Sequence, residues 1–200
     1  MSTRVAFTGH IAGFGTVSGI RMVVGVWRES PFGSFADVMV QTPDGVRTLL
    51  APTAEVAEFI SSTYSFDYVV TGDVDAQLAS DHLTVRAPNL DVSVTVGGPA
   101  PLDRLLRFVP GFLATRPVWL RLIDPVASRI VPGVHTAGTA GNGRREFYGV
   151  RRTRRIVSAS GRYESTPLGG LADLDPPVQF GFSSAPATPQ LVSVTTTIEM

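Results

Sequence analysis

The chain of 200 residues is 44% hydrophobic and 17% charged with no net charge, a composition that favours one globular domain over residues 1–200 and excludes a disordered chain. All 17 basic residues are arginine and cysteine is absent, which excludes Schiff-base and pyridoxal-phosphate lysines, thiolate nucleophiles, zinc–thiolate sites and disulfides. The charge is unevenly distributed, since residues 1–100 carry 5 arginines against 10 acidic residues and residues 101–200 carry 12 arginines against 7.

Residues 22–50 favour β-structure with one tight hairpin. The run 22–26 is rich in β-branched residues, as expected for a deeply buried strand. The turn tetrapeptide 42–45, Thr-Pro-Asp-Gly, separates two apolar segments. Proline presets the first turn dihedral and glycine accepts the left-handed conformation, so we expect a hairpin at this position.

A short helix is expected next, followed by more strands. Thr53 is a suitable N-cap, Glu55 falls in the first turn, and apolar residues recur on one face up to Ile60. Beyond this helix, alternation of apolar and polar residues predicts half-buried strands, most clearly at 90–96. Similar alternation occurs at 66–70, 83–87 and 192–198.

Residues from about 101 to 131 carry most of the remaining helical signals. Pro101 can begin a short helix that Pro110 ends, and a further helical segment is expected at 118–123. Apolar residues, among them Trp119, are interleaved with arginines, a pattern that suits a lid over a lipid-like ligand or peripheral contact with an anionic membrane. The alternative is an insertion that packs on the rest of the domain. No segment approaches the ~20 consecutive apolar residues of a membrane-spanning helix.

Six arginines lie within residues 144–155, directly after a glycine-rich turn. Guanidinium groups and exposed backbone amides both bind oxyanions, so this segment is a candidate site for a carboxylate, a phosphate or a lipid headgroup. The alternative is an exposed strand with structural ion pairs. In a regular strand, alternate positions would share one face. That face would carry Arg144, Glu146, Tyr148, Arg152 and Arg154.

The order of strands, a helical and irregular middle, and strands again predicts a mainly β fold of the α+β class. We expect an antiparallel β-barrel or a strongly curved sandwich with a short helical insertion at about 101–131. Segments 29–38 and 164–174 align with six identical pairs of ten when one residue is gapped, which is compatible with an internal pseudo-twofold. The alternative is a chance match between connections rich in proline and glycine.

Two resemblances to known families follow from short motifs. Residues 145–152, Arg-Glu-Phe-Tyr-Gly-Val-Arg-Arg, resemble the Arg-Glu-x-Tyr/Trp-Gly-x-Pro-Lys stretch of acetoacetate decarboxylase-like proteins, a β-barrel group. Arg152 occupies the position of the Schiff-base lysine, and a guanidinium cannot form that imine, so decarboxylation by this route is excluded. Over its full length the chain resembles a family of uncharacterised, chiefly actinobacterial proteins, on motifs at 15–19, 143–146 and 180–184. That resemblance implies no activity.

The three histidines do not pair at metal-ligand spacings. His10, His82 and His135 are scattered along the chain, so we expect no metal site, and no motif calls for a cofactor. His135 precedes the arginine-rich segment and is, with Glu146 and Tyr148, a candidate for acid–base catalysis.

We expect the protein to bind a small anionic or amphipathic, lipid-like ligand in a barrel cavity. The candidate ligand-binding residues are Arg144, Arg145, Arg152, Arg154, Tyr148 and Trp119. Two alternatives stay open: an unconventional enzyme with acid–base chemistry at Glu146 or His135, and a structural protein that docks an acidic partner through its arginines. Nucleic acid is not expected as a partner, because the net charge is zero and no known binding module is present. The first residues lack the apolar core of a signal peptide, so we expect a cytoplasmic location.

The three hypotheses differ in what they require of the structure. A ligand-binding protein should have a closed apolar cavity with an arginine at its mouth. An enzyme should bury Glu146 beside His135 or Tyr148, because burial moves a carboxyl pKa towards neutrality. A docking protein should lack a cavity and present a flat basic face.

Overall fold

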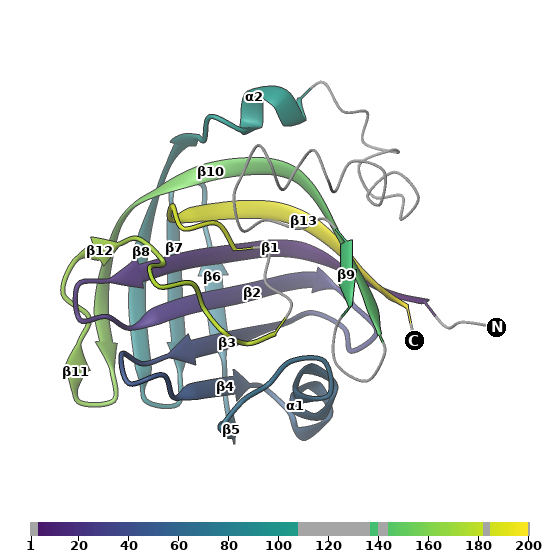
Figure 1. Ribbon diagram of the computed structural model, residues 1–200, viewed down its shortest axis with the longest axis horizontal. Coiled ribbons are helices and arrows are strands. Elements are labelled where there is room, and N and C mark those ends of the chain that lie inside the picture. Colours follow the sequence, from purple (N-terminus) through teal and green to yellow (C-terminus); the bar gives the residue numbers. More distant parts are fainter. Residues whose placement is uncertain (1–3, 108–136, 140–143, 182–184, 200) are drawn as a thin grey trace.

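The strands join into one curled sheet with the shape of a half-barrel (Figure 1). The computed structural model describes residues 4–107, 137–139, 144–181 and 185–199. The main path of the sheet runs β5-β4-β3-β2-β1-β13-β10-β8-β7-β6, and every pair along it is antiparallel except β4–β5. The strands are β1 (Arg4–Thr16), β2 (Arg21–Glu29), β3 (Phe35–Gln41), β4 (Arg47–Ala51), β5 (Tyr68–Thr71), β6 (Asp75–Leu78), β7 (His82–Ala87), β8 (Leu90–Pro99), β9 (Ala137–Thr139), β10 (Arg145–Tyr163), β11 (Thr166–Pro167), β12 (Leu171–Ala172) and β13 (Gln190–Glu199).

The inner face of the curled sheet packs against itself. Strands β6, β7 and β8 lie behind β1 to β4 in Figure 1, so the two ends of the sheet enclose a common core. Alternate residues of each strand point into this core, as the period of two of a β-strand requires. Its fully buried members include Ala12, Phe14, Met22, Val24, Val38, Val40, Leu83, Val85, Val92 and Val94.

The outer face of β1 to β4, β13 and β10 is covered by a second layer. Helix α1 (Ala54–Ser61) and the segments 173–181 and 185–189 lie in front of the sheet in Figure 1. Thr53 caps α1 by accepting a hydrogen bond from the backbone of Val56, and Val56 and Ile60 pack on the outer face of β4. The central strands are therefore buried on both sides, which is why 22–26 shows a continuous apolar run.

Most elements predicted from the sequence are confirmed. The fold is mainly β and barrel-like, the hairpin lies between β3 and β4 with Gly45 at φ +94°, and α1 starts after Thr53. In the insertion, the described part contains the short helix α2 (Asp103–Leu106). Residues 108–131 lie outside the described residues, and so does the helical segment expected at 118–123. Among the described residues, no helix has the length and apolarity needed to cross a membrane.

Two expectations differ from the structure. Strand β10 contains a β-bulge, with a register shift between Val150 and Arg152 opposite β13, so the expected single face of the arginine-rich strand is interrupted. The segments 29–38 and 164–174 do not share a pairing pattern. The first connects the adjacent strands β2 and β3, whereas the second pairs with β10 through β11 and with β1 through β12. The pseudo-twofold does not appear in the pairing of these segments.

Candidate ligand cavity

A cavity of about 120 Å³ lies between the outer face of the sheet and its second layer. It is bounded by outward-facing side chains of β1, β2, β3, β10 and β13, by the end of α1, and by Val178, Phe180, Ala185 and Pro186. Most of its lining is apolar or aromatic. The described residues that line it include Phe7, Ile11, Val23, Trp27, Met39, Phe59, Tyr64, Glu146, Tyr148, Phe180, Val192, Thr196 and Ile198.

Glycines on the outer face leave room for this cavity. Gly13 on β1 faces Leu174 and Ala185 of the covering segment, and an added Cβ would be in ordinary contact with both. Gly25 on β2 is more constrained, since a Cβ there would overlap Asp37 Oδ1 and Trp27 Nε1. Glycine at position 25 therefore leaves the space in which the Asp37 carboxyl group and the Trp27 indole form their hydrogen bond on the outer face of the sheet.

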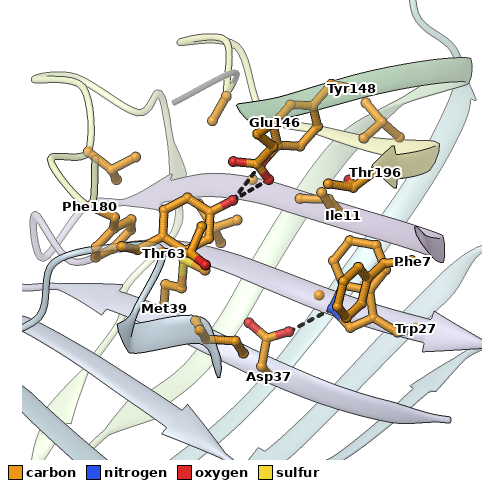
Figure 2. A pocket seen from close by; sticks show the side chains of 18 of the residues that line it. Phe7, Ile11, Trp27, Asp37, Met39, Thr63, Glu146, Tyr148, Phe180 and Thr196 are labelled. Carbon is orange, nitrogen blue, oxygen red and sulfur yellow. Dashed lines mark hydrogen bonds between the residues drawn. The ribbon is translucent and has the colours of Figure 1, made fainter. Parts of the chain in front are cut away.

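Glu146 is buried in a cluster of tyrosine hydroxyls at one side of the cavity (Figure 2). The Tyr64 hydroxyl donates to Glu146 Oε1 at 2.5 Å and lies 2.9 Å from the Tyr148 hydroxyl. Glu146 is 1% exposed, and its Oε2 atom has no hydrogen-bond partner within the described part of the chain. The carboxyl group thus has one oxygen held by Tyr64, and the other is buried without a hydrogen-bond partner among the described residues.

Burial governs the protonation of this cluster. It raises the pKa of Glu146 to about 7, although hydrogen bonds from Tyr64 and Tyr148 oppose the shift. Burial and the adjacent Glu146 carboxylate also raise the pKa of Tyr64 well above its usual range. At neutral pH the tyrosine therefore stays protonated as a donor, and the Glu146 carboxyl group can either hold or release a proton.

A second buried carboxyl group lies on the same cavity, on β3. Trp27 Nε1 donates to Asp37 Oδ1 at 2.8 Å, and Figure 2 shows this pair and the Glu146 cluster at two sides of one pocket. Asp37 is 3% exposed, and burial raises its pKa to about 6 despite the hydrogen bond from Trp27. An apolar cavity with two such carboxyl groups accommodates neutral polar groups and disfavours an anion beside them.

Arg144 is not one of the lining residues, but it contacts two of them, Phe59 and Thr63. Its Nη1 donates to Ser62 Oγ at 2.6 Å, to Thr63 Oγ1 at 2.7 Å and to the carbonyl oxygen of Phe59 at 3.3 Å. The guanidinium carbon is 4.9 Å from the centre of the Phe59 ring. Phe59 and Thr63 both line the cavity, so a positive charge is held against its wall by cation–π contact and hydrogen bonds.

The structure separates the other predicted arginines from Arg144. Arg145 is exposed, and the β-bulge at Arg151 turns Arg152 and Arg154 to the inner face of the sheet. There Arg152 binds Asp103, and Arg154 donates to the carbonyl oxygens of Ser80, Val96 and Gly97. The four arginines are therefore not brought to one place, and Glu146 and Tyr148 are the predicted residues that line the cavity. Trp119 and His135 lie outside the described residues.

Sequence reasoning missed three cavity residues. Asp37 had a usable signal, because it is a carboxylate inside the apolar strand Phe-Ala-Asp-Val-Met-Val. Trp27 and Tyr64 had none, since their positions depend on how β2 and the end of α1 approach other strands. Among the described residues, no three histidine and carboxylate side chains gather as a metal site would require.

Comparison with known proteins gave a weak structural likeness. No family model and no curated protein matches the chain. A solved structure of acetoacetate decarboxylase from Legionella pneumophila resembles the fold with a TM-score of 0.44 and 9% sequence identity, over 98% of this chain and 84% of that chain.

Proposed function

We propose that the protein binds a small amphipathic organic acid, with its apolar body in the outer-face cavity and its acidic group at Arg144. The observation that carries this proposal is an apolar cavity with a guanidinium group held against its border and hydrogen-bonding groups inside. Such a combination of apolar lining and a few polar groups is characteristic of small-molecule sites.

The size of the cavity limits the ligand. An engineered apolar cavity of ~150 Å³ takes up benzene, and this cavity measures about 120 Å³. The enclosed part of the ligand is therefore about one six-membered ring or a short branched chain. A long acyl chain would not fit within this volume.

The electrostatics orient the ligand. Glu146 and Asp37 disfavour an anionic group in the interior, because their own carboxyl groups are already costly to ionise there. Arg144 uses Nη1 for its contacts with Phe59, Ser62 and Thr63. Its Nε and Nη2 atoms can bind a carboxylate in the two-pronged geometry that guanidinium groups favour.

The test measures binding of two probe acids and their uncharged analogue. Native mass spectrometry of the purified full chain first shows whether a ligand is retained after purification. Benzoate, hexanoate and benzyl alcohol are then titrated against the wild type, Arg144→Met and Arg145→Met, with binding followed by ligand-observed NMR. Arg145→Met is the matched control, because Arg145 is the next residue along the chain and is exposed.

We expect Arg144→Met to weaken binding of the acids by about tenfold or more, as for loss of a charge-assisted hydrogen bond. Arg145→Met should bind them like the wild type, and benzyl alcohol should be insensitive to either change. Equal weakening by both substitutions, or no binding of any probe by the wild type at millimolar concentration, would contradict the proposal.

A second candidate function is acid–base catalysis by Glu146. It is favoured by the carboxyl oxygen Oε2, which has no hydrogen-bond partner within the described part of the chain and belongs to a group whose pKa is raised to about 7. A general base with a pKa near the working pH is efficient at removing a proton from carbon next to a carbonyl. The proton would pass from the ligand carbon to Oε2 of the ionised Glu146 carboxylate, which leaves an enolate in the cavity and a neutral Glu146.

Proton exchange of a small ketone in D₂O tests this activity directly. Butanone incubated with the wild type should exchange its α-protons faster than in buffer, and Glu146→Gln should abolish the acceleration. Retained exchange in Glu146→Gln would exclude Glu146 as the base. Wild-type protein that binds butanone without accelerating exchange would leave ligand binding as the function.

A further inference from the structure

A second cavity, of about 300 Å³, lies at the inner face of the sheet, on the other side from the first. Its walls come from β1, β2, β10 and β13, and from the connection between β6 and β7. Its polar lining is strongly basic. The described residues that line it are His10, Arg28, Leu78, Ala79, Ser80, Arg152, Arg154, Leu191 and Ser193.

The sheet register gathers these groups from four strands. His10 pairs with Ser193 across β1–β13, and Ser193 pairs with Arg152 across β13–β10, so the three side chains form one row on the inner face. Arg154 follows two positions after Arg152 and faces the same side. Arg28 lies on β2 opposite the irregularity between Thr8 and Gly9.

The β-bulge in β10 places Arg152 and Arg154 at the second cavity. Before it, Glu146, Tyr148 and Val150 alternate on the outer face and line the first cavity. The extra residue, Arg151, reverses the alternation, and Arg152 and Arg154 therefore line the second cavity. One strand thus supplies a carboxyl group to one cavity and cations to the other.

The positive charge in the second cavity is only partly compensated. Arg152 Nε and Nη2 bind Asp103 at 2.9 and 3.3 Å, but the same carboxylate also binds Arg107 at 3.0 Å. Arg154 donates to backbone carbonyl oxygens, which carry no net charge. Arg28 forms no hydrogen bond or ion pair with another residue of the described chain, and its charge acts on His10 through space. The lining formed by the described residues includes no carboxylate.

His10 also lacks a partner in this cavity. Its Nδ1 atom is buried without a hydrogen-bond partner among the described residues. Buried polar atoms in native proteins nearly always have a protein or bound partner. A ligand oxygen in the cavity would satisfy this nitrogen and would lie beside the Arg28 guanidinium and the Ser193 hydroxyl.

We infer that the second cavity binds the phosphate group of a small phosphorylated ligand. Donors reach it from β1 and β2 on one side, from β13 in the middle and from β10 on the other. A tetrahedral oxyanion can accept hydrogen bonds from all three directions, whereas a planar carboxylate binds best to a single guanidinium group that lies in its own plane. The volume exceeds what the phosphate group alone needs, so the rest of the ligand lies in the cavity as well.

The test uses inorganic phosphate and glycerol 3-phosphate as probes, with acetate as the planar comparison. Each is titrated into the full-length protein by calorimetry at constant ionic strength, so that non-specific screening is the same throughout. The variants are Arg28→Ala, which removes no hydrogen bond or ion pair within the described chain, and Arg155→Ala as control. Arg155 is exposed, lies on the same strand as Arg152 and pairs with Gln190 of the first cavity.

We expect glycerol 3-phosphate to bind the wild type more tightly than phosphate, and both to bind more tightly than acetate. Arg28→Ala should weaken phosphate binding about tenfold to a hundredfold, and Arg155→Ala should leave it within about twofold. Shifts of the His10 imidazole signals on binding, with those of Tyr148 unchanged, would place the ligand in the second cavity.

Three results would overturn the inference. One is the absence of phosphate and glycerol 3-phosphate binding to the wild type at 10 mM, a concentration of the order of weak anion sites. The second is equal weakening by the two arginine substitutions, which would mean a long-range effect of charge. The third is tighter binding of acetate than of phosphate. Because this cavity shares no lining residue with the first, its test is independent of the function proposed above.

Discussion

Replacement of Glu146 by glutamine should remove a pH-dependent loss of stability. The pKa of the folded carboxyl group is raised from 4.5 to about 7, so between these values the folded state holds a proton that the unfolded state has released. Stability therefore falls as pH rises through this window and is constant above it. Glutamine carries no titrating proton, and its amide oxygen can still accept from Tyr64.

The size of the effect follows from the shift. One pKa unit corresponds to about 1.36 kcal/mol, and the group moves from 4.5 to about 7. Between pH 5 and pH 8, Glu146 should lower the wild-type free energy of unfolding by about 2 to 3 kcal/mol. Asp37 adds a similar slope at lower pH, because its pKa is raised to about 6, and this contribution is common to wild type and variant.

Urea denaturation at pH 5, 6, 7 and 8, at constant ionic strength and followed by tryptophan fluorescence, measures the difference. The free energy of unfolding of Glu146→Gln should fall less between pH 5 and pH 8 than that of the wild type, by about 2 to 3 kcal/mol. Glu58→Gln, on the exposed side of α1, should follow the wild type. Parallel pH profiles for the wild type and Glu146→Gln would refute the reasoning, because they would mean that Glu146 is ionised throughout in the folded protein.

Three further substitutions test other parts of the structure. Gly25→Ala should lower the free energy of unfolding in urea denaturation by about 1 to 3 kcal/mol, because the added Cβ would overlap the hydrogen-bonded Asp37 carboxyl and Trp27 indole groups. The control Gly98→Ala, where nothing lies within 4 Å of the added Cβ, should stay within about 0.5 kcal/mol of the wild type. Asp103→Asn should lower the free energy of unfolding at pH 7 by at least about 2 kcal/mol, because hydrogen bonds from Arg152, Thr153 and Arg107 outweigh burial and lower the pKa of Asp103 to about 2. This contribution is present above pH 4 and is lost towards pH 2, so an unchanged acid-unfolding curve would contradict it. Arg28→Ala should raise the pKa of His10, but not to its ordinary value, because burial lowers that pKa more than the Arg28 charge does. An NMR titration of the imidazole that shows no rise in the pKa would refute the proximity of the two groups.

Local physics in the sequence was enough to predict much of the fold. The hairpin at 42–45 follows from the conformational preferences of proline and glycine, and α1 follows from a cap at Thr53 and an apolar stripe. The run 22–26 indicated burial because a strand covered on both faces needs no polar face. The candidate residues Glu146 and Tyr148 could be found because both belong to one short, chemically unusual segment.

The sequence by itself therefore determined the fold class, the exclusion of amine and thiol chemistry, and two residues of the first cavity. Only the tertiary structure decided which groups meet. Asp37 and Trp27 are ten residues apart and Tyr64 and Glu146 are 82 apart, and each pair is joined by sheet curvature and packing that no local pattern encodes. The bulge at Arg151 reverses the side on which Arg152 and Arg154 lie, so a strand with one regular alternation in sequence supplies two cavities on opposite faces.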